Sequence, residues 1–244
     1  MDRQVAAAHD DFIPLWRGAS PGRPLTGLTV LVVEDSRFAS EAVRLLCLRS
    51  GARIRRADCL RTAARHLQVY RPAVVIVDLG LPDGNGAHLI AQMAGMCPRV
   101  PVVLGMSGDP DNEGAAMAAG ADGFLAKPID SLAQFQHAIL SVLPPRARPT
   151  GLRVITDDTV APDRGALRDD LAHVAEVLAS SADTGAIDYI ARFLAGVARS
   201  ARDQPLEQAA AALARDHSAG HALAADLARI SGLVQDRLSA AGGT

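Results

Sequence analysis

The chain has 244 residues, 49% of them hydrophobic, and its 25 basic and 27 acidic side chains give a formal net charge of −2. This length predicts one or two domains with a sizeable core. No apolar stretch reaches the roughly 18 residues that cross a bilayer, and the acidic first residues lack the features of a secretory signal. We therefore expect a soluble, cytoplasmic protein without a membrane span. The three cysteines, Cys47, Cys59 and Cys97, show no metal-ligand spacing and are interpreted as small core residues in a reducing compartment.

Between residues 28 and 143, short β-branched runs alternate with longer amphipathic stretches. The runs predict strands and the stretches predict helices. The expected strands lie at 30–33, 53–57, 74–77, 102–106 and 123–126, and the expected helices at 36–49, 60–70, 88–96, 112–119 and 131–142. Five strand–helix units in succession indicate an α/β fold with a doubly wound, five-stranded parallel sheet and helices on both faces.

The last part of the chain carries only helical signals, after a proline-rich segment at 144–151 that indicates a linker. Helices are expected at 163–182 and 184–202, followed by a helical segment from 205 to 238 with a break near 218–220. This pattern divides the chain into an N-terminal leader at 1–26, an α/β domain at 27–144, a linker at 145–162 and an all-α helical domain at 163–244.

Charged residues stand directly after three of the predicted strands. Glu34 and Asp35 follow the first strand, Asp78 follows the third, and Lys127, the only lysine of the chain, follows the fifth. Sites in such sheets form beyond the carboxyl ends of the strands, so we expect these side chains to lie close together. Three carboxylates suit Mg²⁺, which prefers oxygen ligands, and a carboxylate such as Asp78 can attack phosphorus. Lys127 and the hydroxyl of Ser107 would then contact the phosphoryl oxygens.

Residues 28 to about 145 closely resemble the receiver domain of two-component response regulators. The resemblance rests on the pair Glu34-Asp35, on Asp78, on Ser107 at the end of the fourth strand, and on the pair Lys127-Pro128. It implies a flavodoxin-like fold and a regulatory protein, not an enzyme, that accepts a phosphoryl group on Asp78 from a histidine kinase or phosphotransfer protein.

The resemblance also implies roles for three further positions. The backbone carbonyl of Gly80 would be a third protein ligand of Mg²⁺, beside the acidic residues. Phe124, three positions before the lysine, would be the switch residue, without the hydroxyl that a tyrosine carries. Pro128 is a candidate for a cis peptide bond.

The helical domain is expected to be the output module, which dimerises or binds a protein partner. Its last segment carries an apolar stripe at Leu223, Leu227, Ile230, Val234 and Leu238. Such a stripe needs a partner surface, most simply the same segment of a second chain across a two-fold axis. The alternative is a bundle within one chain, in which the stripe packs against Leu171, Leu178, Ile190 and Leu194.

Two other classes of output stay open. A divergent helix-turn-helix would make the protein a transcription factor, and the cluster of Arg192, Arg199 and Arg202 is compatible with that. However, residues 151–244 carry 9 basic and 13 acidic side chains, which makes DNA an unlikely partner. The third class is a degenerate histidine-phosphotransfer bundle in which His217 or His221 is active.

Overall fold

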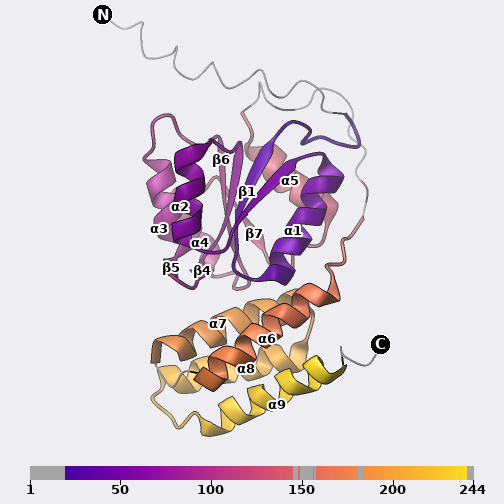
Figure 1. The fold of residues 1–244 in the computed structure, drawn as a ribbon. Helices are drawn as coiled ribbons and strands as arrows, with labels where there is room; N and C mark the ends of the chain where they lie inside the picture. Colours follow the sequence, from indigo (N-terminus) through magenta and orange to yellow (C-terminus); the bar gives the residue numbers. More distant parts are fainter. Residues whose placement is uncertain (1–19, 145–147, 149–155, 157, 181–183, 241–244) are drawn as a thin grey trace, which may run out of the picture.

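The computed structural model describes residues 20–144, 148, 156, 158–180 and 184–240, which form an α/β domain and a helical bundle (Figure 1). The α/β domain is built on a sheet whose five strands are all parallel, in the order β2-β1-β3-β6-β7. These strands are β1 (Thr29–Val33), β2 (Arg53–Ala57), β3 (Val74–Asp78), β6 (Val102–Ser107) and β7 (Gly123–Ala126). The predicted doubly wound parallel sheet is confirmed, and each predicted strand is correct to within one residue at either end.

Helices cover both faces of this sheet, because alternate strand residues point to opposite sides. On one face, Val30, Val32 and Ile76 pack with α1 (Arg37–Ser50) and α5 (Leu132–Val142). On the other face, Leu31, Val33 and Val75 pack with α2 (Leu60–Val69), α3 (Gly86–Ala94) and α4 (Asn112–Ala118). Strand β3 lies between two neighbours and two helical layers, so all five of its residues are buried.

The loop after β3 contains a feature that the sequence did not predict, a short antiparallel hairpin of β4 (Gly80–Leu81) and β5 (Gly84–Asn85). Asp83 at its turn accepts hydrogen bonds from the amides of Leu60 and Arg61 and so caps helix α2. A Cβ atom at Gly86 would lie 2.0 Å from the backbone oxygen of Asp78, so glycine is needed for the chain to return beside that residue.

The C-terminal helices form a four-helix bundle of α6 (Arg164–Ser180), α7 (Thr184–Ser200), α8 (Gln204–Ser218) and α9 (Ala224–Ala240). The break expected near 218–220 is present, and Gly220 there has a φ of 70°. Ile230 and Val234 of the apolar stripe are fully buried in a core with Ile190 and Leu194. The stripe therefore packs within one chain, which is the bundle alternative and removes the physical reason for tail-mediated pairing.

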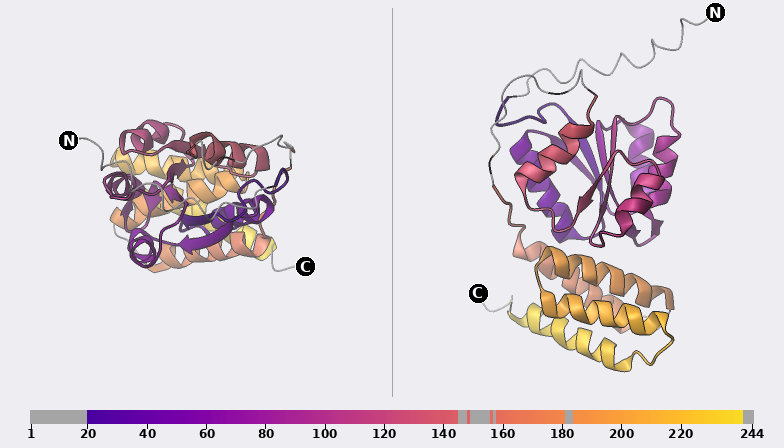
Figure 2. Two further views of the ribbon diagram at one scale, coloured as in Figure 1. Left: turned by 90° about the horizontal axis from the view of Figure 1, so that it is seen from above. Right: turned by 180° about the vertical axis from the view of Figure 1, so that it is seen from behind.

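The bundle lies against the end of the sheet at which β4 and β5 are found, as the front and back views agree (Figures 1 and 2). The connecting segment is pinned to the α/β domain: the amide of Val160 donates to Asp130 and that of Leu132 to Asp158. Of the predicted leader only residues 20–26 are described, and of the predicted linker only 148, 156 and 158–162.

Two smaller findings concern composition. No helix within the described ranges is long and apolar enough to cross a membrane.

Cys47 is buried, as expected, and burial raises the pKa of its thiol to about 12. Cys97 is exposed and Cys59 half-buried, so the prediction of three core cysteines is wrong for Cys97 and only partly right for Cys59. Cys97 lies in the loop after α3. Its neighbours in the sequence are apolar, but the loop leaves its side chain exposed.

Core packing in the sheet predicts the effect of a single truncation. Leu104 in β6 is fully buried, so Leu104→Ala should lower the free energy of unfolding by about 2–5 kcal/mol, through lost apolar transfer and the cavity left behind. Val69 at the end of α2 is 83% exposed, and Val69→Ala should change it by less than about 0.5 kcal/mol. Urea denaturation of the full chain measures both, and equal losses would contradict this description of the core.

Candidate functional site

Three carboxylates meet at the carboxyl end of the central strands. Asp78 is the last residue of β3, and Glu34 and Asp35 directly follow β1, its neighbour in the sheet, where Val33 pairs with Val77. One carboxylate oxygen from each of the three residues lies within 4.8 Å of the others. The structure thus brings together the three acidic residues that the sequence nominated, in an arrangement that can hold a metal ion.

Lys127 lies inside this cluster, from the end of β7. Its Nζ is 2.6 Å from Oε2 of Glu34 and 3.1 Å from Oδ1 of Asp78. The groups are enclosed: Glu34 is 0%, Asp78 6% and Lys127 8% exposed. The Lys127–Pro128 peptide bond is cis, and the amide of Lys127 donates to the carbonyl of Ser107.

One ammonium does not balance three carboxylates in so small a volume. Burial raises the pKa of Glu34 well above its usual range, although Lys127 opposes the rise. Burial and the nearby Asp78 raise the pKa of Asp35 to about 6. Burial alone would lower the pKa of Lys127, but the charges of Asp78 and Glu34 outweigh it and the net shift is upward. The cluster therefore favours an additional cation.

The remaining predicted residues surround the same edge. Ser107 is the last residue of β6. Its hydroxyl accepts hydrogen bonds from the amide of Asp109 at 3.1 Å and from Nδ2 of Asn112 at 3.0 Å. The amide of Gly80 donates to Oδ2 of Asp78 at 3.1 Å. The role of the Gly80 carbonyl as a metal ligand stays a prediction.

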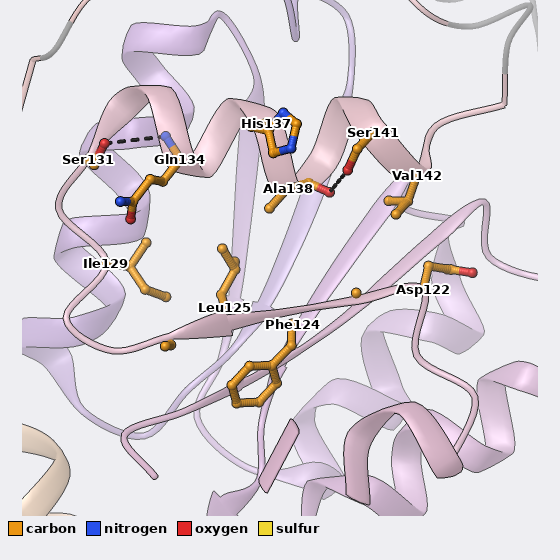
Figure 3. Close-up of a pocket in the computed structure, with 12 residues that line it drawn as sticks. Asp122, Phe124, Leu125, Ile129, Ser131, Gln134, His137, Ala138, Ser141 and Val142 are labelled. Atoms are coloured by element: carbon orange, nitrogen blue, oxygen red, sulfur yellow. Dashed lines mark hydrogen bonds between the residues drawn. The ribbon is translucent and has the colours of Figure 1, made fainter. Parts of the chain in front are cut away.

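Phe124 belongs to a different part of the domain from the carboxylates. It packs half-buried against the core under α3 and α4, and points away from α5, whereas Leu125 points toward α5 (Figure 3). Between β7 and α5 lies an open hollow of about 400 Å³ on the surface, lined by Ile129 and Ala138 among others. Its lining includes none of the three carboxylates.

Two residues of the helical bundle that form buried or part-buried hydrogen bonds at this edge, Tyr189 and Asp170, were not nominated from the sequence. The hydroxyl of Tyr189 in α7 lies 3.1 Å from Oδ2 of Asp35 and 3.4 Å from Nε2 of His173. A phenol has one proton, so if it goes to Asp35 then His173 must donate to the phenol oxygen. Burial and the charge of Asp35 raise the pKa of Tyr189, which keeps its hydroxyl protonated.

The second residue is Asp170 in α6, which is 3% exposed. Its carboxylate accepts hydrogen bonds from the hydroxyl of Ser36 at 2.7 Å and from the amides of Arg37 and Phe38 at 2.8 and 3.0 Å. It therefore caps the N-terminus of α1, where a negative charge is favourable. More than 130 residues separate these partners, and no local pattern in the sequence could have paired them.

The chain matches a known family over the region that carries the site. Residues 30–139 match the response regulator receiver domain. The chain contains a response regulator receiver domain. Together with the parallel sheet and the acidic cluster, this match confirms the resemblance seen in the sequence.

Individual proteins are also similar to part of the chain. The chain is 32% identical over 99 residues to the KDP operon transcriptional regulatory protein KdpE of Escherichia coli, which is 41% of this chain and 44% of that protein. It is 32% identical over 102 residues to the virulence transcriptional regulatory protein PhoP of Salmonella typhimurium, which is 41% of this chain and 46% of that protein. The chain thus spans about half the length of these relatives.

Among solved structures, the chemotaxis response regulator CheY4 of Vibrio cholerae is similar, with 24% identity and a TM-score of 0.44 over 48% of this chain and 98% of that one.

The crowded carboxylates predict a stabilising effect of Mg²⁺. A ligand that binds the folded state at about 100 times its Kd stabilises a protein by about 2.7 kcal/mol, so Mg²⁺ should raise the thermal midpoint of the receiver. Asp35→Ala removes one carboxylate of the cluster and should abolish most of this rise. Glu113→Ala, at an exposed acidic position in α4, should leave it unchanged. If Asp35→Ala keeps the full rise, Asp35 does not contribute to the metal site.

Proposed function

We propose that the protein is a two-component response regulator whose Asp78 accepts a phosphoryl group from a histidine kinase or a phosphotransfer protein. The observation that carries the proposal is the enclosed cluster in which Asp78 lies with Glu34, Asp35 and Lys127. A carboxylate, a set of oxygen ligands for a divalent ion and a separate ammonium are the parts that phosphoryl transfer to an aspartate needs.

Each side chain has a role in this transfer. An oxygen of Asp78 forms the new bond to phosphorus while the bond to the donor's nitrogen breaks, and that nitrogen keeps the electron pair. When bound, Mg²⁺ would neutralise charge on the phosphoryl oxygens, held by Glu34, Asp35, Asp78 and the Gly80 carbonyl. Lys127 lies 3.1 Å from Asp78 and can contact a further phosphoryl oxygen, as can the hydroxyl of Ser107. These residues position the phosphoryl group and neutralise its charge, which suits a regulator that assists its own phosphorylation.

We assign the output role to the four-helix bundle and propose that it binds a protein partner. Two of the three arginines that are compatible with DNA binding are paired with carboxylates: Arg199 lies 2.7 Å from Glu207 and Arg202 lies 2.5 Å from Asp130. Dimerisation of the chain stays a prediction from the sequence, since the apolar stripe that motivated it is covered inside the bundle.

Phosphorylation of the acceptor can be tested directly. With Mg²⁺ and radiolabelled acetyl phosphate, the full chain should take up label, and Asp78→Asn should take up none because the amide is not a nucleophile. Asp83→Asn is the matched control: Asp83 lies in the same loop but caps α2, asparagine can keep one of its two hydrogen bonds, and labelling should persist. Undiminished label in Asp78→Asn would contradict the assignment of the acceptor.

A transcriptional output is the second candidate, because the relatives KdpE and PhoP are named as transcriptional regulators. Filter binding of the beryllofluoride-activated chain to genomic DNA fragments, at about 50 and 200 mM salt, separates the two. A DNA-binding output would show affinity that falls steeply with salt. We expect no binding at either concentration, because residues 151–244 are acidic overall.

A further inference from the structure

The edge of the receiver that carries Asp78 is covered by helices of the same chain. Helix α7 contacts both β4 and α1, and α6 contacts α1. A Cβ atom at Gly196 in α7 would lie 4.0 Å from Nζ of Lys127, and the hydroxyl of Tyr189 is bonded to Asp35. The bundle spans this end of the sheet in both the front and the back view (Figures 1 and 2). A protein that delivers a phosphoryl group to Asp78 has to approach through the space that α7 occupies.

The covering helices are held by buried polar contacts as well as by packing. Asp170 of α6 accepts three hydrogen bonds from residues 36–38, and Tyr189 of α7 donates to Asp35. Exposed ion pairs flank them, Arg37 with Asp169 at 2.6 Å and Arg202 with Asp130. Exposed pairs contribute little, so Asp170 and Tyr189 are the contacts on which closure depends.

Helix α7 cannot itself be a phosphodonor, and His173 of the neighbouring α6 contacts the hydroxyl of Tyr189, not a carboxylate of the cluster. Residues 184–200 contain no histidine. His217 and His221, the candidates from the sequence, are on other segments, where Nδ1 of His217 lies 2.7 Å from Asp188 and Nδ1 of His221 lies 3.0 Å from Asp216. Helix α7 therefore occupies the place of a donor without the group that a donor transfers.

We propose that α6 and α7 are an intramolecular competitor of the phosphodonor: the acceptor edge of the receiver is an interaction surface whose resident partner is the bundle of its own chain. The proposal rests on the proposed function of Asp78. In the closed state Tyr189 is bonded to one of the carboxylates that would hold the metal, and Asp170 fills the N-terminus of α1. A donor must displace the bundle, so its apparent affinity is reduced by the fraction of molecules that are open.

Linkage gives the competitor a second role. If phosphorylation and the closed bundle exclude each other, then phosphorylation must favour the open state by the same factor by which closure disfavours phosphorylation. The face of α6 and α7 that carries Asp170, Tyr189 and Gly196 becomes available to another protein only in the open state. The same helices would thus mask the acceptor in one state and present the output surface in the other.

The experiment uses the full chain, Mg²⁺ and acetyl phosphate, and compares initial rates of labelling. A small donor meets the same obstacle as a protein donor, because Asp78 is only 6% exposed in the closed state. Tyr189→Phe removes only the hydroxyl and keeps the ring against Phe193, whereas Asp170→Asn weakens the cap of α1 without touching a carboxylate of the cluster. Each change should raise the labelling rate by about threefold or more, and the double variant on the order of tenfold, since each weakens a hydrogen bond to a charged group. Asp216→Asn, which removes an exposed charge inside the bundle, should label like the wild type.

Hydrogen–deuterium exchange supplies a readout that does not depend on labelling. The amides of Arg37 and Phe38 are protected by Asp170, so they should exchange faster in the double variant, and in the wild type once beryllofluoride and Mg²⁺ are bound. Unchanged labelling rates together with unchanged exchange would overturn the proposal that α6 and α7 compete with the phosphodonor. Absence of label in every variant, with faster exchange in the double variant, would instead overturn the proposed phosphorylation of Asp78. It would still support the contact by which α6 covers the N-terminus of α1 in the wild type.

Discussion

The contact of Lys127 with Glu34 and Asp78 is the constraint on which the rest of the site depends. Three carboxylates and one ammonium are enclosed within a few ångströms, and the loss of water from such groups is costly unless each finds a partner. The sheet provides the partners by ending β1, β3 and β7 at the same edge. The net charge of the four side chains is negative, and this excess negative charge favours the binding of a divalent cation.

The same excess explains why the bundle docks with polar groups of a particular kind. Tyr189 offers a hydroxyl, a donor without charge, to the half-buried Asp35. Asp170, a further carboxylate, does not face the acidic cluster; it faces the amides that open α1, where partial positive charge is exposed. Each bundle residue at this edge therefore matches the sign of the group that it contacts, although both domains are close to neutral or acidic overall.

How much of this could be read from the sequence differs between the two domains. The strands and the residues at their ends were predicted because short β-branched runs, a helical period of 3.6 and the turn residues between them are local signals. The hairpin β4–β5 was missed because strands of two residues are too short to show such a run. Tyr189 and Asp170 were missed for another reason: their partners lie 154 and 132 to 134 residues away, and a tyrosine or aspartate on an amphipathic helix looks like any solvated position. The sequence also left open whether the last apolar stripe packs within the chain, since both arrangements bury the same face.

The cap of α1 shows why the closed arrangement can be reversible. Ser36 already accepts a hydrogen bond from the amide of Ala39, so the helix keeps its own N-cap when the bundle leaves. The amides of Arg37 and Phe38 and the hydroxyl of Ser36 lose Asp170, but an open edge admits water to them, and a hydrogen bond exchanged for one to water costs much less than one lost in a dry interior. The apolar core of the bundle, by contrast, is formed among its own four helices and is not opened by release. The bundle can therefore leave the receiver as a folded unit, and the polar contacts at α1 and Asp35 set the balance between the two states.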